Sequence, residues 1–89
     1  MGLRATVLIG IHLRSARDSQ LVIEQLRQWK EVVEVLYTTG SYALFIKVVV
    51  EDIDEFHKFL VKKLQKITEV QSTESFVCLD QPILRGISV

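Results

Sequence analysis

The chain has 89 residues, a formal net charge of zero and one cysteine, and 48% of its residues are hydrophobic. This length allows one small core, which excludes an enzyme with separate cofactor and substrate domains. The balanced charge creates no net field that would recruit nucleic acid or an anionic membrane, and the lone Cys78 fits a reducing compartment. No apolar run reaches transmembrane length, so we expect a soluble, cytoplasmic protein without direct contacts to DNA or membranes.

The first elements predicted along the chain are a strand and a helix. Residues Ala5 to Leu13 are rich in β-branched and leucine side chains, which is typical of a strand. Ser15 and Asp18 have the spacing of a capping box, in which a hydroxyl and an acid three residues later cap a helix start. The helix is expected to end near Lys30 and to bury Val22, Ile23, Leu26 and Trp29.

A hairpin and a second helix come next. Glu31 to Thr38 and Tyr42 to Val50 are predicted strands, and the turn Thr39-Gly40-Ser41 joins them. Alternation in the first of these strands places Val33, Val35 and Tyr37 on one face. Asp52 and Glu55 repeat the capping spacing, and the helix that follows is expected to bury Ile53, Phe56, Leu60, Leu64 and Ile67.

The last predicted strand runs from Glu69 to Gln81, with Ser72, Glu74, Phe76 and Cys78 on one face and Thr73, Ser75, Val77 and Leu79 on the other. The order βαββαβ predicts a ferredoxin-like α+β sandwich, in which two helices cover one face of a four-stranded antiparallel sheet. We expect one domain over residues 1–89, with a core at 5–80 and a C-terminal tail at 81–89. The tail is predicted to dock on a neighbouring subunit or to add an edge strand through Ile83, Leu84, Ile87 and Val89.

The second face of this sheet is also expected to be apolar. The third strand carries Tyr42, Leu44, Ile46, Val48 and Val50 on one face and Ala43, Phe45 and Val49 on the other. Helices cover only one face of such a sheet, so the second face needs another cover. An identical sheet from a second subunit is the simplest cover, which predicts a face-to-face homodimer, a dimeric α+β barrel.

Two polar segments are candidate ligand contacts. The turn from Thr38 to Tyr42 can offer backbone N–H and hydroxyl groups to a small anion such as a carboxylate. It can equally be an ordinary hairpin turn that needs Gly40 for a positive φ. The run from Gln71 to Ser75 can add hydroxyl groups near the turn, or it can be the solvated part of an edge strand. From the residues alone, the structural interpretation of both segments is favoured.

The remaining reactive side chains do not form a catalytic pattern. His12 and His57 have no partner at metal-ligand spacing, and Cys78 is expected to be a small buried residue in a strand. Trp29 is expected to belong to the core. A basic stripe on the second helix, Lys58, Lys62 and Lys66, can touch phosphates but is more typical of a solvated face. We expect no enzyme activity, no metal and no cofactor.

A family resemblance covers the chain from about Ala5 to Leu79. The segments that carry it are Glu34 to Tyr42 (EVLYTTGSY), Leu44 to Val48, the Phe- and Leu-rich helix Ile53 to Leu64, Ile67 to Val70, and Thr73 to Ser75. Together they resemble the ligand-binding and oligomerisation domain of Lrp/AsnC transcription regulators, the RAM domain. The resemblance implies a homodimer of facing sheets, often assembled further into dimers of dimers or rings, with amino-acid effectors bound between dimers.

The same resemblance implies a set of effector-binding residues: Thr39, Gly40, Ser41 and Tyr42 in the loop, with Thr73 and Ser75 on the last strand. Ala43 stands where the family usually has an aspartate. The first strand starts close to Met1, so we expect a stand-alone module without the DNA-binding domain of the family. Its predicted role is non-enzymatic sensing of an amino acid or related metabolite in transcription regulation, with full-length Lrp/AsnC regulators as further partners.

Three alternatives remain open. Small dimeric α+β barrels include enzymes such as cofactor-independent oxygenases, which would need a roomy pocket between sheet and helices. An ACT-type allosteric module would need a glycine turn after the first strand, where this chain has Arg14 to Arg17. A purely structural assembly role would give defined oligomers without a response to ligands.

Overall fold

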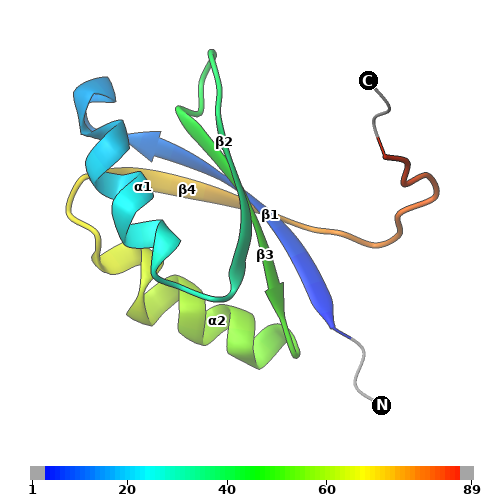
Figure 1. Cartoon of the computed structure of the whole chain (residues 1–89). Coiled ribbons are helices and arrows are strands. Elements are labelled where there is room, and N and C mark those ends of the chain that lie inside the picture. The colour runs from blue at the N-terminus through cyan, green and yellow to red at the C-terminus, as the bar shows by residue number, and fades with distance from the viewer. Residues whose placement is uncertain (1–3, 87–89) are drawn as a thin grey trace.

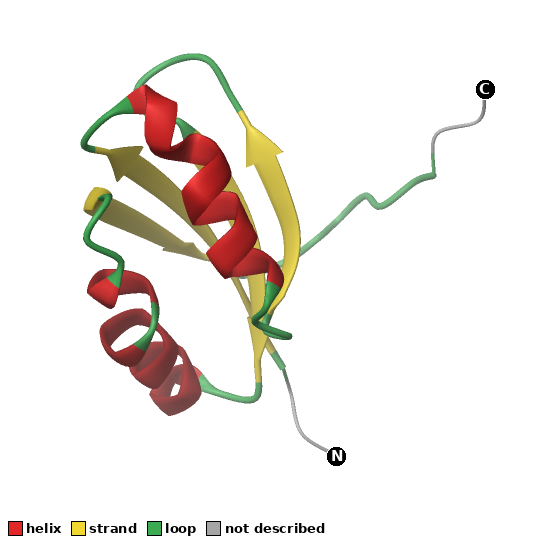
Figure 2. Cartoon of the chain, turned by 60° about the vertical axis from the view of Figure 1, so that its left-hand side comes forward, coloured by secondary structure: helices red, strands yellow, loops and turns green. Residues whose placement is uncertain are grey.

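The computed structural model describes residues 4–86, so the ends 1–3 and 87–89 lie outside the description (Figure 1). One antiparallel sheet has the strand order β2-β3-β1-β4. Both helices lie on the same face of it (Figure 2), which confirms the predicted ferredoxin-like sandwich. The elements are β1 (Ala5–Leu13), α1 (Ser19–Arg27), β2 (Val32–Tyr37), β3 (Leu44–Val50), α2 (Ile53–Lys62) and β4 (Val70–Val77), with short 3₁₀ turns at Ala16–Asp18 and Leu64–Lys66.

The core lies between the helices and the face of the sheet that they cover, here called the helix side. In β1 and β3 every second side chain points to this side, and these side chains are buried except at the two ends of β1, as a strand with one covered face requires. The register pairs Ile9 with Ile46, and Val22 and Leu26 from α1 are fully buried above the sheet. The other buried apolar residues are Val7, Ile11, Leu44, Val48, Val50, Phe56, Phe59, Leu64, Ile67 and Val70.

The two predicted helix caps have different outcomes. The Asp52 carboxylate accepts a hydrogen bond from the backbone N–H of Glu55 at 2.9 Å, so the cap of α2 is confirmed. The cap at Ser15 is wrong, because its side chain caps no helix. The backbone N–H of Asp18 instead donates to the Ser15 carbonyl at 3.0 Å, which closes a 3₁₀ turn, and α1 begins only at Ser19.

The hairpin departs from simple alternation at two points. In β2, Val32 pairs with Val48 but Glu34 pairs with Lys47, so Val33 is the extra residue of a β-bulge rather than part of a regular apolar face. The placement of Tyr42 beside Leu44 on the helix side is also wrong. β3 begins only at Leu44, and the Tyr42 ring lies against residues of the opposite face.

That opposite face is covered by no helix and is here called the open face. It is formed mainly by Leu8, Leu36, Phe45, Val49 and Phe76. Leu8 is 38% exposed, Leu36 51% and Phe76 43%, and the Phe45 and Phe76 rings stack with centroids 6.4 Å apart. The expectation that the third strand carries apolar side chains on both faces is therefore confirmed.

The segment after β4 leaves the sheet. Residues 79–86 form neither helix nor strand, and Figure 1 shows them projecting away from the domain. Leu79 is 95% exposed, and Ile83 and Leu84 are exposed as well. The expected edge strand is not formed by the described part of the tail, and Ile87 and Val89 lie outside the description. Docking of the tail on a neighbouring subunit stays a prediction.

Candidate functional site

The loop between β2 and β3, residues 38–43, is the predicted effector loop. The Thr38 N–H donates to the Ala43 carbonyl at 3.0 Å, and the Thr38 hydroxyl donates to the Tyr42 carbonyl at 2.5 Å. Gly40 has a φ of 109°, a conformation that side chains other than glycine rarely adopt, and open space lies where its Cβ would be. The loop therefore has a closed base and an exposed tip, made of Thr39, Gly40 and Ser41.

Tyr42 reaches from this loop across two strands of the open face. A Cβ added to Gly10 of β1 would lie 2.8 Å from the Tyr42 ring, so the ring rests directly on the glycine backbone. The Tyr42 hydroxyl donates a hydrogen bond to the carboxylate of Glu74 on β4. The rings of His12 and Phe45 contact the Tyr42 ring edge-on, with centroids 4.6 and 5.6 Å away. Tyr42 is thus held at its ring and at its hydroxyl.

Thr73 and Ser75 lie on the other side of the sheet. Their cross-strand partners are Ile11 and Ile9, which point to the helix side, whereas Glu74 between them pairs with Gly10 on the open face. Ser75 is exposed because the helices do not reach over this part of β4. Within one chain the structure brings Thr39, Gly40, Ser41 and Tyr42 together, and it separates them from Thr73 and Ser75.

Sequence reasoning did not select Gly10, Glu74 and His12, which contact Tyr42. A glycine inside an otherwise apolar strand is a signal of close approach by another group, and Gly10 is such a residue. Nothing in the sequence indicates that Glu74 would be the partner. Cys78, which was expected to be buried, is exposed just after β4, and its thiol lies 3.3 Å from the Asp80 carbonyl. That expectation was wrong.

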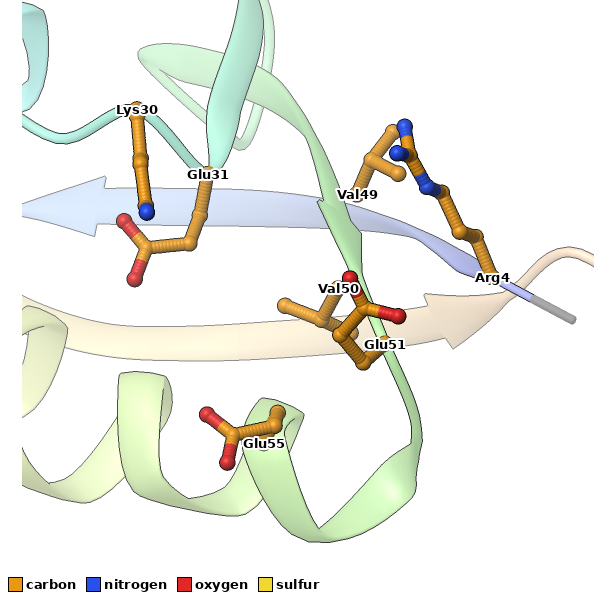
Figure 3. A pocket seen from close by; sticks show the side chains of 7 residues that line it. All are labelled: Arg4, Lys30, Glu31, Val49, Val50, Glu51 and Glu55. Atoms are coloured by element: carbon orange, nitrogen blue, oxygen red, sulfur yellow. The ribbon is translucent and has the colours of Figure 1, made fainter. Parts of the chain in front are cut away.

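A hollow of about 360 Å³ lies away from the loop, where β3 leads into α2 (Figure 3). It is lined by Arg4, Lys30, Glu31, Val49, Val50, Glu51 and Glu55. The Glu31 carboxylate accepts a hydrogen bond from the Lys63 ammonium at 2.8 Å. Burial raises the pKa of Glu31, but the bond from Lys63, a backbone hydrogen bond and the charges of Lys63 and Lys30 outweigh it and lower that pKa below its ordinary value of 4.5.

Two further hollows are shallow surface features of similar size. One, of about 380 Å³, runs between α1 and β2 and is lined mainly by apolar side chains such as Leu26, Val33 and Tyr37. The other, of about 400 Å³, lies between the open face and the start of the tail, at Leu8, Lys47 and Leu79. Within residues 4–86, no group of three or more His, Cys, Asp or Glu side chains could hold a metal ion. No helix in this range is long and apolar enough to cross a membrane.

Comparison with known proteins identifies the domain type. The family model described as "Lrp/AsnC ligand binding domain" matches residues 5–87. The regulatory protein AsnC of Haemophilus influenzae is 46% identical over 87 residues, which cover 98% of this chain and 58% of that protein. AsnC of Escherichia coli K12 is 42% identical, with 98% of this chain and 57% of that protein covered. The chain thus spans less than two thirds of the length of these curated relatives.

Solved structures agree with this assignment. The structure of E. coli AsnC has a TM-score of 0.90 and 43% identity, covering 93% of this chain and 56% of that chain. The crystal structure of FFRP-DM1 has a TM-score of 0.80 and 27% identity, and the match covers 84% of this chain and 99% of that one. A transcriptional regulator from Neisseria meningitidis, solved as a complex with L-Met, shares the fold with a TM-score of 0.83 at 22% identity over 90% of this chain and 53% of that chain.

Proposed function

Because the chain belongs to the Lrp/AsnC ligand-binding domain family, we propose that it senses a small amino acid or a related metabolite and assembles into oligomers, as a regulatory module rather than an enzyme. One observation carries the proposal. The loop with the exposed Gly40 tip stands at the margin of an open apolar face, so a ligand site and an association surface are neighbours. The relatives at 46% and 42% identity are named regulatory proteins, which supports a role in transcription regulation.

The proposed homodimer buries the open face of one subunit against that of another. Leu8, Leu36 and Phe76 are each more than a third exposed on this face, and water contact with such apolar surface is unfavourable. Lys47 is the charged residue in the middle of it, paired with Leu8 and Glu34 in the register. Burial of an unpaired charge is costly, so we expect the dimer to keep the Lys47 ammonium beside a carboxylate such as that of Glu34.

Because Thr73 and Ser75 are separated from the loop within one chain, the proposed effector site takes its residues from more than one subunit. Both residues are on the helix side of β4, where Ser75 is exposed. We therefore expect an effector that contacts both these hydroxyls and the loop tip at Gly40 to bridge different subunits. Such an effector would stabilise an interface directly and shift the assembly equilibrium toward the state in which that interface is formed.

The non-enzymatic part of the proposal is supported by the packing. An oxygenase-like site was expected to need a roomy pocket between sheet and helices, but large buried side chains such as Ile9, Leu26 and Phe59 occupy that space. Of the three hollows described above, one lies at the edge of the domain between α1 and β2, and the other two open elsewhere on the surface. Co-assembly with full-length Lrp/AsnC regulators remains part of the proposal.

A thermal-shift screen against the twenty amino acids, with assembly size followed by light scattering, tests the sensing role. L-methionine is included, since it is the ligand of the Neisseria regulator that shares the fold. A ligand at about 100 times its dissociation constant should stabilise the folded state by roughly 2.7 kcal/mol. We expect a selective shift with one or a few amino acids, together with a change in assembly size. A stable oligomer with no shift for any of them would contradict the sensing role and favour a purely structural one.

A further inference from the structure

We propose that Glu74 is a positioning residue, which holds the effector loop in place by its hydrogen bond to Tyr42 and so couples the loop to the open face. The inference rests on the proposed function in one respect, because it takes residues 38–43 as the effector loop. The set of effector-binding residues that the resemblance implied contains Tyr42 but neither Glu74 nor Gly10. The contacts of the open face bring these three residues together.

The Tyr42 ring rests on the backbone of Gly10, a contact here called the glycine seat. Gly10 is buried although it belongs to the open face, because the ring covers it. A side chain at this position would begin 2.8 Å from the ring, which is closer than such contacts occur, so only glycine allows this placement. Phe45 and His12 flank the ring edge-on. The ring is therefore part of the open face, although its backbone belongs to the loop.

Glu74 determines the direction in which the Tyr42 ring points. Glu74 is the cross-strand partner of Gly10, so its carboxylate lies at the far side of the glycine seat and accepts a hydrogen bond from the Tyr42 hydroxyl. Hydrogen bonds to a charged acceptor are about twice as strong as those between neutral groups. Aromatic contacts alone would let the ring slide along the β1 backbone, whereas the bond to Glu74 anchors its end.

The backbone of Tyr42 connects its ring to the base of the loop. The Tyr42 carbonyl accepts a hydrogen bond from the Thr38 hydroxyl. The Thr38 N–H donates a second hydrogen bond to the carbonyl of Ala43, the residue after Tyr42. A displaced Tyr42 would therefore disturb both hydrogen bonds that close the loop below Gly40. Glu74, on the last strand, is thus linked by three hydrogen bonds to the base of a loop that lies more than thirty residues earlier in the chain.

Coupling between the two surfaces follows from this chain of contacts. A ligand that moves the loop tip moves Tyr42, and the Tyr42 ring forms part of the surface that the proposed dimer buries. By linkage, association through the open face changes the ligand affinity of the loop by the same factor as the ligand changes association. Glu74 is the residue whose removal is expected to uncouple the two.

Hydrogen exchange on the full chain tests the positioning role without any ligand. The variants are Glu74→Ala, Glu74→Gln, Tyr42→Phe and the double variant Tyr42→Phe/Glu74→Ala. Losing one hydrogen bond should make exchange of the Thr38 amide about five-fold faster. We expect this in Glu74→Ala and in Tyr42→Phe, with no further increase in the double variant, and recovery in Glu74→Gln, which keeps an acceptor oxygen. The core amides of β1 and α2 should exchange as in the original chain.

The matched control is Glu34→Ala. Glu34 is also a carboxylate of the open face, paired with Lys47 at the opposite edge of the sheet. Glu34→Ala should leave hydrogen exchange at the Thr38 amide unchanged. If Glu34→Ala and Glu74→Ala weaken the dimer equally, that weakening comes from the loss of a negative charge and not from the loop. Unchanged exchange in Glu74→Ala, or effects of Tyr42→Phe and Glu74→Ala that simply add, would overturn the positioning role.

A second variant tests the contact between the Tyr42 ring and Gly10. Gly10→Ala should displace the ring and accelerate Thr38 exchange to the same extent as Tyr42→Phe, with far-UV circular dichroism showing that the sheet is retained. An unperturbed Thr38 amide in folded Gly10→Ala would overturn the proposed seat. These outcomes are independent of the amino-acid screen, so failure of the sensing proposal and failure of the positioning role are distinguishable.

Discussion

The two faces of the sheet carry similar side chains but serve different partners. Ile9 and Leu8 are neighbours in β1, and Ile9 is fully buried under the helices while Leu8 is 38% exposed on the open face. The helix side is completed by the chain itself, so its apolar residues stabilise the fold of one subunit. The open face also presents Leu36 and Phe76 to solvent, and nothing within residues 4–86 covers them. Mutations on the two faces should therefore affect different equilibria.

The largest expected effect compares the two neighbours directly. Ile9→Ala should lower the free energy of unfolding by about 3 kcal/mol, because it leaves a cavity under both helices. Leu8→Ala should cost less than about 1 kcal/mol in a monomeric subunit, since Leu8 is already partly in water. Urea unfolding at several protein concentrations separates the two contributions. Equal losses at low concentration would show that the faces do not differ as described.

Association through the open face comes next in size. Phe76→Ser should weaken the dimer by about 2 kcal/mol, or roughly thirty-fold in the dissociation constant, because Phe76 is an aromatic anchor that stacks with Phe45. Sedimentation velocity measures the change. Val61→Ser is the matched control, since Val61 is 55% exposed on α2, which lies on the helix side. If both variants weakened association equally, the open face would not be the interface.

A substitution at Gly40 tests the conformation of the loop at the margin of the open face. Gly40→Val should destabilise the chain by about 1–2 kcal/mol, because a β-branched residue is strained at a φ of 109°. Ser41→Val places the same side chain one residue later, where φ is negative, and should change the melting temperature little. In the amino-acid screen, Gly40→Val should also lose the ligand response. A melting temperature that stays the same in Gly40→Val would contradict the assigned loop conformation.

The smallest expected effect concerns Glu31, which precedes β2 and bonds Lys63 after α2. Its folded-state pKa is below the ordinary value of 4.5, so its carboxylate stabilises the fold above that pH, and this contribution is lost as the pH falls through the lowered pKa. Lys63→Met should cost less than about 1 kcal/mol at pH 7, since the pair is partly exposed. The difference between the original chain and the variant should shrink on acidification toward pH 3. Thermal melts across this range measure it, and a constant difference would contradict the ion pair.

Periodicity predicted most of the fold, because it reports burial directly. Val22 and Leu26 were assigned to the buried face that they occupy, and β1 has the bounds that its composition indicates. Capping was less predictable. Asp52 and Ser15 have the same spacing to an acid, but only Asp52 caps a helix, because the chain after Ser15 first forms a 3₁₀ turn. A short local motif therefore indicates where a helix can start, and the wider packing decides whether it does.

The candidate site was predicted only where it is local in sequence. The loop and its glycine at position 40 were recognisable, since a turn signal needs no long-range information. The position of Tyr42 was not, because alternation was extended beyond the residue at which β3 begins. Its partners Gly10 and Glu74 lie on strands that are distant in the chain. Their meeting depends on the sheet register, which a single sequence does not specify.

The sheet topology also has a consequence for synthesis on the ribosome. Of the four strands of this sheet β1 is made first, yet it is an interior strand, and Val7 pairs with Val48 on one side and with Val77 on the other. At about 5–20 residues per second, its second edge stays without a partner for several seconds while the rest of the chain is made. A nascent chain stopped before β4 would expose an apolar strand edge to other nascent chains on the same message. Within this sheet, the strand that is made first thus depends on the strand that is made last to cover its free edge.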